Sequence, residues 1–270
     1  MALREYEVEF ESIPIHCWEG GDGFPILMMH GSGPGVSTLG NWRQVLEPLA
    51  QRYRVLAFDL IGFGLSGRKR ARPYFDLALW ERQAQRMLAC LPDGPAGIIA
   101  HSLSGAIALR LAGANAHVTK IVTTGTLGAA FPINPYLAAA WTTPRTGAEL
   151  RRIFEPAVYD RSAITEQFVQ NRMAILAKDD YGAHFSAMFE GDKQQYIDAC
   201  VVPPSTLSNI RGDILMMHGR NDVMVPFESS TLVLAGALPR ADIVAIGCCG
   251  HGVAQEQPEK FVRSVSGLLG

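Results

Sequence analysis

The sequence predicts an α/β fold with a mostly parallel, twisted sheet flanked by helices. Two observations support this. Short apolar runs alternate with helical patterns through the first half of the chain, and the alternation returns near the C-terminus. Between them, prolines and helical stretches replace the strands. We therefore predict an α/β core at residues 1–130 and 207–270, with a helical cap (lid) at residues 131–206.

The individual elements follow from apolar spacing. Predicted strands are residues 25–29, 54–58, 97–100, 118–124, 214–217 and 243–246. Predicted core helices are 42–49, 77–91, 105–112, 227–237 and 258–269, and the cap helices are 146–154, 162–178 and 194–201. A chain of 270 residues is long enough to bury one large sheet.

Composition and charge narrow the class of partner. The chain is 48% hydrophobic and 19% charged, as in ordinary globular proteins. A formal net charge of −2 provides no basic field for nucleic acid or an anionic membrane. The basic run Arg68–Arg70 is short and lacks interleaved aromatic residues, so we interpret it as a solvated loop. We expect neither a nucleic-acid nor a membrane partner.

Cysteine usage and terminal patterns indicate a cytoplasmic protein. The five cysteines form no CxxC pair, which favours free thiols in a reducing compartment. The N-terminal residues lack the apolar core of a signal peptide, and no apolar run is long enough to span a bilayer. Metal-binding patterns such as HExxH are also missing, so we predict no metal site and no cofactor.

Ser102 is the candidate nucleophile. It stands where an apolar strand meets a helix of small residues, in Ala100-His-Ser-Leu-Ser104. A hydroxyl presented on such a sharp turn needs small residues two positions to either side, usually as G-x-S-x-G. Ala100 and Ser104 take the two glycine positions here. The alternative is that Ser102 merely caps the helix. Ser104 is a weaker nucleophile candidate because it would lie inside that helix.

Asp222 and His251 complete a possible catalytic triad. Each follows its own predicted strand, and the chain order serine, acid, histidine is that of the α/β-hydrolase fold. Taken singly, Asp222 could be a turn residue and His251 a polar loop residue. Together with Ser102 they favour an α/β-hydrolase fold with a helical cap inserted after the sixth strand. His251 would act as the base, and Asp222 would orient it.

An oxyanion hole would need two backbone N–H donors near Ser102. Leu103 supplies one at the start of a helix, where the helix dipole favours negative charge. Ser32 supplies the other, from the glycine-rich loop His30–Gly35. The glycines of this loop could be simple turn formers, but they also suit close approach to a ligand.

The motifs resemble one family in particular. The segment His30-Gly-Ser-Gly-Pro-Gly-Val-Ser37, followed by Asn41-Trp42, together with Asp59–Ser66 and His218–Asp222, resembles the meta-cleavage product hydrolases. These enzymes hydrolyse carbon–carbon bonds in bacterial aromatic degradation, and the likeness covers nearly the whole chain. It implies a small-molecule carboxylate substrate of the 2-hydroxy-6-oxo-hexa-2,4-dienoate type. It also implies a homo-oligomer, because family members often self-associate.

The resemblance also assigns substrate contacts. Arg172 falls where the family keeps an arginine for the substrate carboxylate, and its planar fork suits paired oxygens. The alternative is a solvent-facing helix arginine. Asn41 would assist at the same polar end of the pocket, while His101 and Gly31 would line it.

Three positions depart from the family pattern. His101 replaces an asparagine, Ser104 replaces a glycine, and Gly252 replaces a tryptophan beside the catalytic histidine. We expect the absence of an indole at position 252 to leave a large open volume.

Other activities occur on the same fold and fit parts of this pattern. A carboxylesterase or enol-lactonase would use the same triad but would not need Arg172. A non-catalytic binding protein on this fold would gain nothing from all three triad residues. A haloalkane dehalogenase or epoxide hydrolase would need aspartate at position 102 and is excluded.

Overall fold

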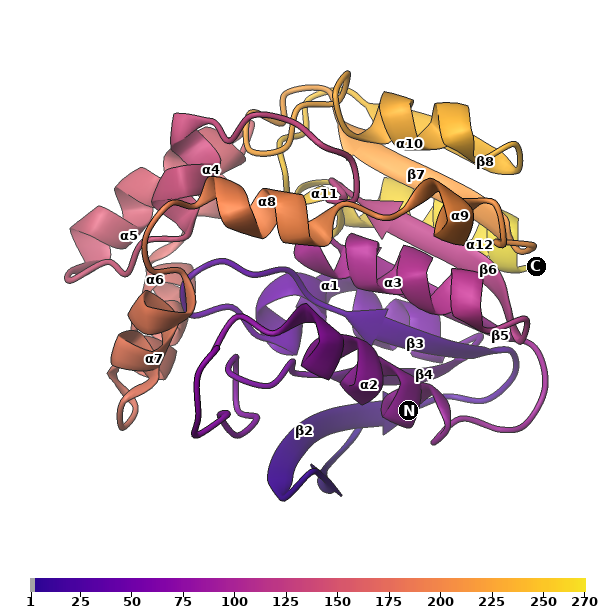
Figure 1. The fold of residues 1–270 in the computed structure, drawn as a ribbon, viewed down its shortest axis with the longest axis horizontal. Helices are drawn as coiled ribbons and strands as arrows, with labels where there is room; N and C mark the ends of the chain where they lie inside the picture. Colours follow the sequence, from indigo (N-terminus) through magenta and orange to yellow (C-terminus); the bar gives the residue numbers. More distant parts are fainter. Residues whose placement is uncertain (1–2) are drawn as a thin grey trace.

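The computed structural model describes residues 3–270, which form an eight-stranded sheet in the order β1-β2-β4-β3-β5-β6-β7-β8 (Figure 1). Neighbours from β4 to β8 are parallel, while β2 is antiparallel to both β1 and β4. The strands are β1 Arg4–Phe10, β2 Ile13–Gly20, β3 Pro25–Met29, β4 Arg54–Phe58, β5 Ala96–His101, β6 Val118–Thr124, β7 Asp213–Gly219 and β8 Ala241–Ile246. The predicted fold class is confirmed.

Helices cover both faces of the sheet and form the whole insertion after β6. The core helices are α1 Thr38–Ala50, α2 Leu77–Leu88, α3 Leu103–Ala114, α10 Thr231–Ala237, α11 Val253–Glu256 and α12 Pro258–Leu269. The insertion contains α4 Pro135–Ala140, α5 Gly147–Phe154, η1 Glu155–Ala157, η2 Arg161–Ala163, α6 Glu166–Ala177, α7 Tyr181–Met188, α8 Gln194–Cys200 and α9 Pro204–Leu207. Figure 1 shows α4 to α7 beyond one end of the strands.

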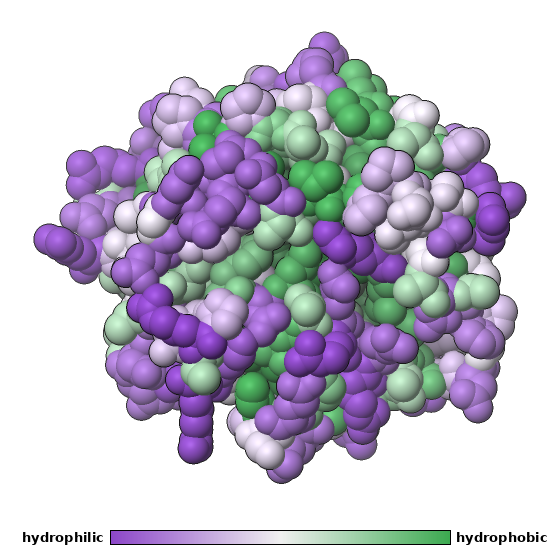
Figure 2. All heavy atoms as spheres, in the orientation of Figure 1, coloured by the Kyte–Doolittle hydropathy of each residue, from purple (hydrophilic) through white to green (hydrophobic). Residues whose placement is uncertain are grey.

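Alternating strand residues build a separate apolar layer on each face. In β3, Leu27 and Met29 join the cluster that packs beneath α2 and α3, whereas Ile26 and Met28 join the cluster beneath α1 and α12. Successive side chains of a strand point to opposite faces, so a parallel strand covered on both sides is apolar throughout. Figure 2 shows hydrophobic residues in the middle of one face and hydrophilic ones around its outline.

The β1–β2 hairpin was not among the predicted strands. Its two-residue turn is Glu11–Ser12, both at positive φ (49° and 60°). Such a turn usually carries Asn-Gly or Asp-Gly, and neither is present. The alternation of Glu5, Glu7 and Glu9 with apolar residues in β1 was the available signal.

The cap contains helices that periodicity did not predict. Helix α7 was missed because its apolar residues show little helical periodicity, and α4 because it spans only six residues. Helix α6 begins four residues later than predicted because the Thr165 hydroxyl accepts a hydrogen bond from the Phe168 N–H at 3.1 Å. That bond caps the helix and fixes its start.

None of the helices within residues 3–270 has the length and apolar character needed to cross a bilayer. Over the same residues, His, Cys, Asp and Glu side chains do not gather in threes in a way that would hold a metal ion.

Candidate active site

Ser102 occupies a strained backbone position between β5 and α3. Its φ is 56° and its ψ is −120°, a conformation that L-residues rarely adopt. The Ser102 N–H donates to the Thr124 carbonyl at 2.9 Å, and its own carbonyl accepts from Gly105 and Leu127 at 3.0 Å each. The side chain makes no capping hydrogen bond to α3. Helix capping therefore does not explain this serine, and its hydroxyl remains available.

Small residues around Ser102 are required by close approach. A Cβ on Gly31 would lie 2.9 Å from the His101 ring and 3.1 Å from the Ser102 Cβ. A Cβ on Gly105 would lie 1.8 Å from Thr126 Oγ1. Ser104, where the family keeps glycine, lies in α3 and donates its hydroxyl hydrogen to the His30 carbonyl. This departure ties the helix to the end of β3.

Asp222 and His251 are joined by a short hydrogen bond. His251 Nδ1 lies 2.7 Å from Asp222 Oδ2, and the carboxylate is fully buried. The other oxygen of Asp222 accepts from the N–H groups of Met224 and Val225 at 2.8 and 3.1 Å. These bonds fix the carboxylate so that it can orient the imidazole.

Charge and hydrogen bonding outweigh burial at Asp222. Burial alone raises the pKa of the carboxyl, but attraction to His251 and hydrogen bonds from His218 and His251 hold that pKa well below its usual range. His218 Nε2 lies 3.1 Å from Asp222 Oδ2 and 2.9 Å from the Val225 carbonyl. In the sequence, His218 is only the first residue of the motif His218–Asp222, whereas its ring in the structure contacts the acid itself.

Gly125, at the end of β6, is a site residue that the sequence analysis missed. Its φ is 50°, and a Cβ there would lie 2.8 Å from His251 Nδ1 and 3.1 Å from Asp222 Oδ2. The glycine thus leaves room for the histidine–aspartate pair. Its place directly after a parallel strand was the signal that could have found it.

Ser102 and His251 line the same cavity without being hydrogen-bonded. Within residues 3–270, no hydrogen bond within 3.5 Å joins the Ser102 hydroxyl to the ring of His251. Such bonds in hydrolases often tighten only when the reacting group is in place.

Two unused backbone donors face this region. Within the described chain, neither the Ser32 nor the Leu103 N–H donates to a protein acceptor. The loop that carries Ser32 is held by Asn41, whose Oδ1 accepts from the Gly31 N–H at 3.0 Å. Trp141 of the cap donates to Ser32 Oγ at 2.9 Å. The loop geometry suits an oxyanion hole.

His101 lies beside the histidine of the pair. Its ring centroid is 4.6 Å from that of His251, and its Nδ1 lies 2.9 Å from Thr124 Oγ1 and 3.1 Å from the Thr124 carbonyl. The carbonyl can only accept, so Nδ1 carries the proton and Nε2 is left as an acceptor. Burial, and then repulsion from His251, keep the pKa of His101 well below the usual value for histidine.

Arg172 of α6 is buried, and none of the acidic side chains within residues 3–270 forms an ion pair with it. It is 5% exposed, and its guanidinium lies between the rings of Phe154 and Phe168, 4.3 and 4.6 Å from their centroids. Nη1 donates to the Pro34 carbonyl at 2.9 Å, but Nε has no hydrogen-bond partner. The alternative of a solvent-facing arginine is therefore wrong.

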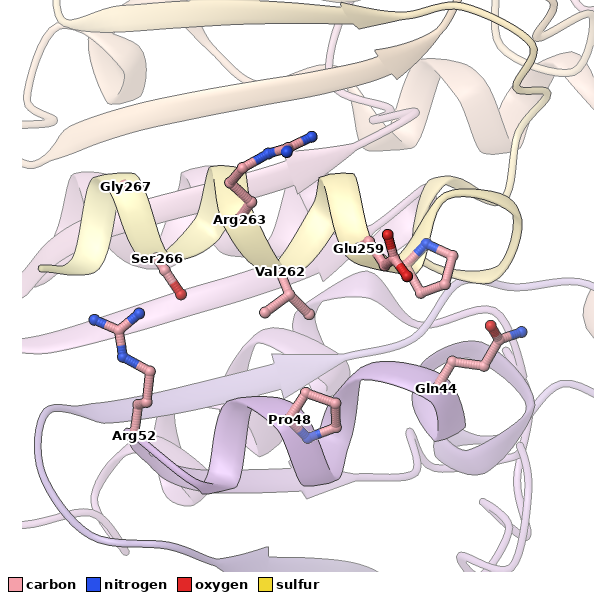
Figure 3. Close-up of a pocket in the computed structure, with 9 residues that line it drawn as sticks. Gln44, Pro48, Arg52, Glu259, Val262, Arg263, Ser266 and Gly267 are labelled. Atoms are coloured by element: carbon pink, nitrogen blue, oxygen red, sulfur yellow. The ribbon is translucent and has the colours of Figure 1, made fainter.

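These residues share one small cavity. Its volume is about 60 Å³, well below the roughly 300–1,000 Å³ of a typical ligand pocket. Every candidate site residue lines it except Leu103 and Asp222, which lie directly behind Ser102 and His251. A larger groove of about 720 Å³ lies between α1 and α12, where Val262 points toward Pro48 (Figure 3). That groove contains none of the candidate residues.

The prediction of a large open volume beside Gly252 is wrong. A Cβ on Gly252 would lie 2.3 Å from Gln255 Oε1, so the side chain of Gln255 fills the space where a larger residue would stand. The sequence showed the missing indole but not the side chain that folds back from one helical turn later.

Comparison with known proteins identifies the family. Residues 26–264 match the alpha/beta hydrolase family. The chain belongs to that family. A 2-hydroxymuconate semialdehyde hydrolase of Pseudomonas sp. strain CF600 is 32% identical over 97% of this chain and 93% of its own.

Solved structures agree with this family assignment. A meta-cleavage product hydrolase from Pseudomonas fluorescens IP01 superimposes with a TM-score of 0.92 at 29% identity, covering 97% of this chain and 96% of its own. A 2-hydroxy-6-oxo-6-phenylhexa-2,4-dienoate hydrolase from Rhodococcus sp. strain RHA1 has a TM-score of 0.85 at 26% identity, covering 98% and 99%. The resemblance to the meta-cleavage product hydrolases is confirmed.

Proposed function

We propose that this protein hydrolyses the C5–C6 bond of a 2-hydroxy-6-oxo-hexa-2,4-dienoate, using Ser102, His251 and Asp222. The observation that carries the proposal is the buried, unpaired Arg172 in the same cavity as Ser102. An ester hydrolase has no use for such a charge, whereas the carboxylate of a dienoate would satisfy it. The names of the relatives support the same substrate class.

The residues divide the chemistry between the two ends of the substrate. Arg172 and Asn41 would hold the carboxylate and the 2-oxo group of the ketonised form. Ser102 would attack the C6 carbonyl while His251 takes its proton, and the Ser32 and Leu103 N–H groups would stabilise the oxyanion. Collapse would break the C5–C6 bond, and the electron pair would stay on the dienoate fragment and take up a proton. Water, activated by His251, would then release the carboxylic acid from Ser102.

We infer a small substituent at C6, an aldehyde or a methyl ketone, because the names of two relatives indicate such groups. Trp141, Leu137 and Ala140 of the cap line the cavity. The curated relatives include hydrolases named for a semialdehyde and for a heptadienoate.

The helical insertion gives the reaction a lid. We propose residues 131–206 as the lid and residues 1–130 and 207–270 as the catalytic core, because Trp141 and Arg172 reach the active-site loop from the insertion. A cytoplasmic location is part of the proposal and suits the free thiols of all five cysteines. Self-association, implied by the resemblance, stays a prediction.

A panel of yellow ring-fission products tests the proposal. Hydrolysis is followed as loss of visible absorbance for aldehyde, methyl and phenyl substituents at C6. Folded Ser102→Ala and His251→Ala proteins should each lose roughly 10⁴–10⁶-fold in kcat. Near-normal turnover by folded Ser102→Ala would overturn the assignment of Ser102 as the nucleophile. Hydrolysis of neutral esters alone would indicate an esterase instead.

A further inference from the structure

A second, larger hollow adjoins the catalytic cavity at the arginine end. This outer groove has a volume of about 620 Å³ and lies between the start of α1, helix α6 and helix α11. Five residues line both the cavity and the groove and so form a partition between them: Asn41, Val158, Phe168, Arg172 and Gln255. The two spaces meet where the substrate carboxylate would bind.

Most of the partition is held by contacts that the site itself needs. Asn41 holds the Gly31 N–H of the oxyanion loop, and Arg172 holds the Pro34 carbonyl. Phe168 packs edge-on against Phe154, with ring centroids 5.2 Å apart, and covers the arginine. Displacing any of these would disturb the oxyanion loop or the anion-binding side chain.

Within residues 3–270, the side chain of Gln255 is held in the partition by a single hydrogen bond. Its side-chain amide donates to the Gly40 carbonyl at the start of α1, and its Oε1 stands in the space beside Gly252. Gln255 is half-buried. Rotation about its side-chain bonds would leave the main chain around Gly40 and Gly252 in place. Because Gly252 has no side chain, the Gln255 amide oxygen can occupy the space beside it.

The order in which the two products leave requires a passage through the partition. Resting on the proposed function, the dienoate fragment at Arg172 must leave while the acyl group is still attached to Ser102. The catalytic cavity has little spare volume, and Arg172 borders the outer groove directly. We infer that the Gln255 side chain is the gate through which the dienoate half enters from the outer groove and returns to it.

Ligand-binding rates in an inactive protein test this gate. In Ser102→Ala, binding of 2-hydroxymuconate semialdehyde is followed by stopped-flow absorbance. Adding Gln255→Ala should raise the association and dissociation rate constants together by about fivefold, the factor that corresponds to one hydrogen bond, with Kd unchanged. A rise in the dissociation rate constant alone would make Gln255 a ligand contact and overturn the gate.

A second route to the open state provides an internal check. Gly252→Ala introduces a Cβ that collides with Gln255 Oε1, so it should raise both rate constants as well, and add nothing further in Gln255→Ala. Gln257→Ala is the matched control, because its amide binds the Cys248 carbonyl and borders neither hollow. It should leave both rate constants unchanged.

The outcomes separate the gate from the function beneath it. Wild-type protein that fails to hydrolyse the semialdehyde would overturn the proposed function and the gate with it. A hydrolysing wild type whose Gln255→Ala and Gly252→Ala variants keep both rate constants would overturn the gate alone.

Discussion

Arg172 shows how one side chain can point to a ligand. Burying a guanidinium costs desolvation energy, and among the described residues Arg172 has two aromatic rings and one carbonyl as its partners but no carboxylate. Burial accordingly lowers the pKa of this arginine. A planar anion placed against the free edge of the fork would restore the missing hydrogen bonds, which supports the proposed role of Arg172 as a binding group.

Replacing Arg172 with lysine should separate anion binding from hydrolysis. Lysine keeps the charge but loses the fork and the stacking between Phe154 and Phe168. We expect kcat/KM for a ring-fission product to fall roughly 10–100-fold, the equivalent of one or two charge-assisted hydrogen bonds. Turnover of a neutral p-nitrophenyl ester should change little. Equal losses on both substrates would indicate a structural role for the arginine.

His101 should make stability depend on pH. Its pKa is lowered in the folded protein, so below about pH 6.5 the unfolded chain takes up a proton that the folded chain does not. The stability from this neutral ring is therefore present above pH 6.5 and is lost as pH falls. The slope of the unfolding free energy should be shallower in His101→Asn by up to roughly 1.4 kcal/mol per pH unit.

Denaturant unfolding between pH 6.5 and 5 measures that slope. Some dependence will remain, because burial also lowers the pKa of His30 and His184. His117→Asn, at an exposed position, is the control and should leave the slope as in wild type. Parallel slopes for wild type and His101→Asn would show that His101 takes up its proton equally in both states.

At the scale of elements, the turn after β6 positions the proposed catalytic pair, His251 and Asp222. The Gly125 N–H donates to the Met217 carbonyl of β7 at 3.1 Å, which joins this turn to the strand that precedes Asp222. The positive φ and the contact with both His251 and Asp222 leave no room for a side chain.

Gly125→Ala should damage catalysis more than folding. The new Cβ would push against His251 Nδ1, and a displacement of about 1 Å can cost roughly 10²-fold in rate. Gly128→Ala is the matched control, because it also carries a positive φ (137°) but faces Leu234 and Val202. We expect similar losses of Tm for both variants and a large loss of kcat for Gly125→Ala alone. Equal kcat values for Gly125→Ala and Gly128→Ala would show that the turn at Gly125 does not contribute to catalysis.

The elements also show what a sequence can and cannot predict. Strands β3, β4 and β6 and helix α12 have the predicted bounds, because they are apolar runs or regular helices between clear breaks. The order of Ser102, Asp222 and His251 was legible because each follows its own strand. The hairpin β1–β2 was missed because its turn, Glu11–Ser12, has no glycine.

Contacts made across the fold were harder to foresee. Gly252 was interpreted as open space, yet Gln255 fills it, because the sequence does not say where a flexible side chain will settle. Likewise, the contact of His218 with Asp222 and the contact of Trp141 with Ser32 depend on how loops and cap meet. Such details follow from packing and not from local pattern.

At the scale of the whole molecule, hydrogen bonds join the cap to the core at the active site. The Ala157 carbonyl accepts from the His251 N–H at 2.7 Å, and Trp141 and Arg172 bind the loop Ser32–Pro34. The cap also has a small apolar cluster of its own, formed by Leu150, Ile164 and Val169. A segment with a small cluster of its own should open more readily than the central strands β3 and β5, which are buried on both faces.

Hydrogen exchange should therefore report ligand binding in the cap. In Ser102→Ala, bound 2-hydroxymuconate semialdehyde would add contacts to Arg172 and Trp141, so amide exchange in α4, α5 and α6 should slow. At short labelling times, strands β5 and β6 should show no exchange with or without ligand, because exchange there requires global opening. Helix α12, on the far face of the sheet, serves as the internal control. Uniform slowing over the whole chain would mean that cap and core open as one unit, and slowing confined to β5 and β6 would contradict a lid. Because the catalytic cavity is small and the cap supplies one wall of it, we expect the protection to appear first in α6, which carries Arg172, and at the C-terminal end of α4, directly before Trp141.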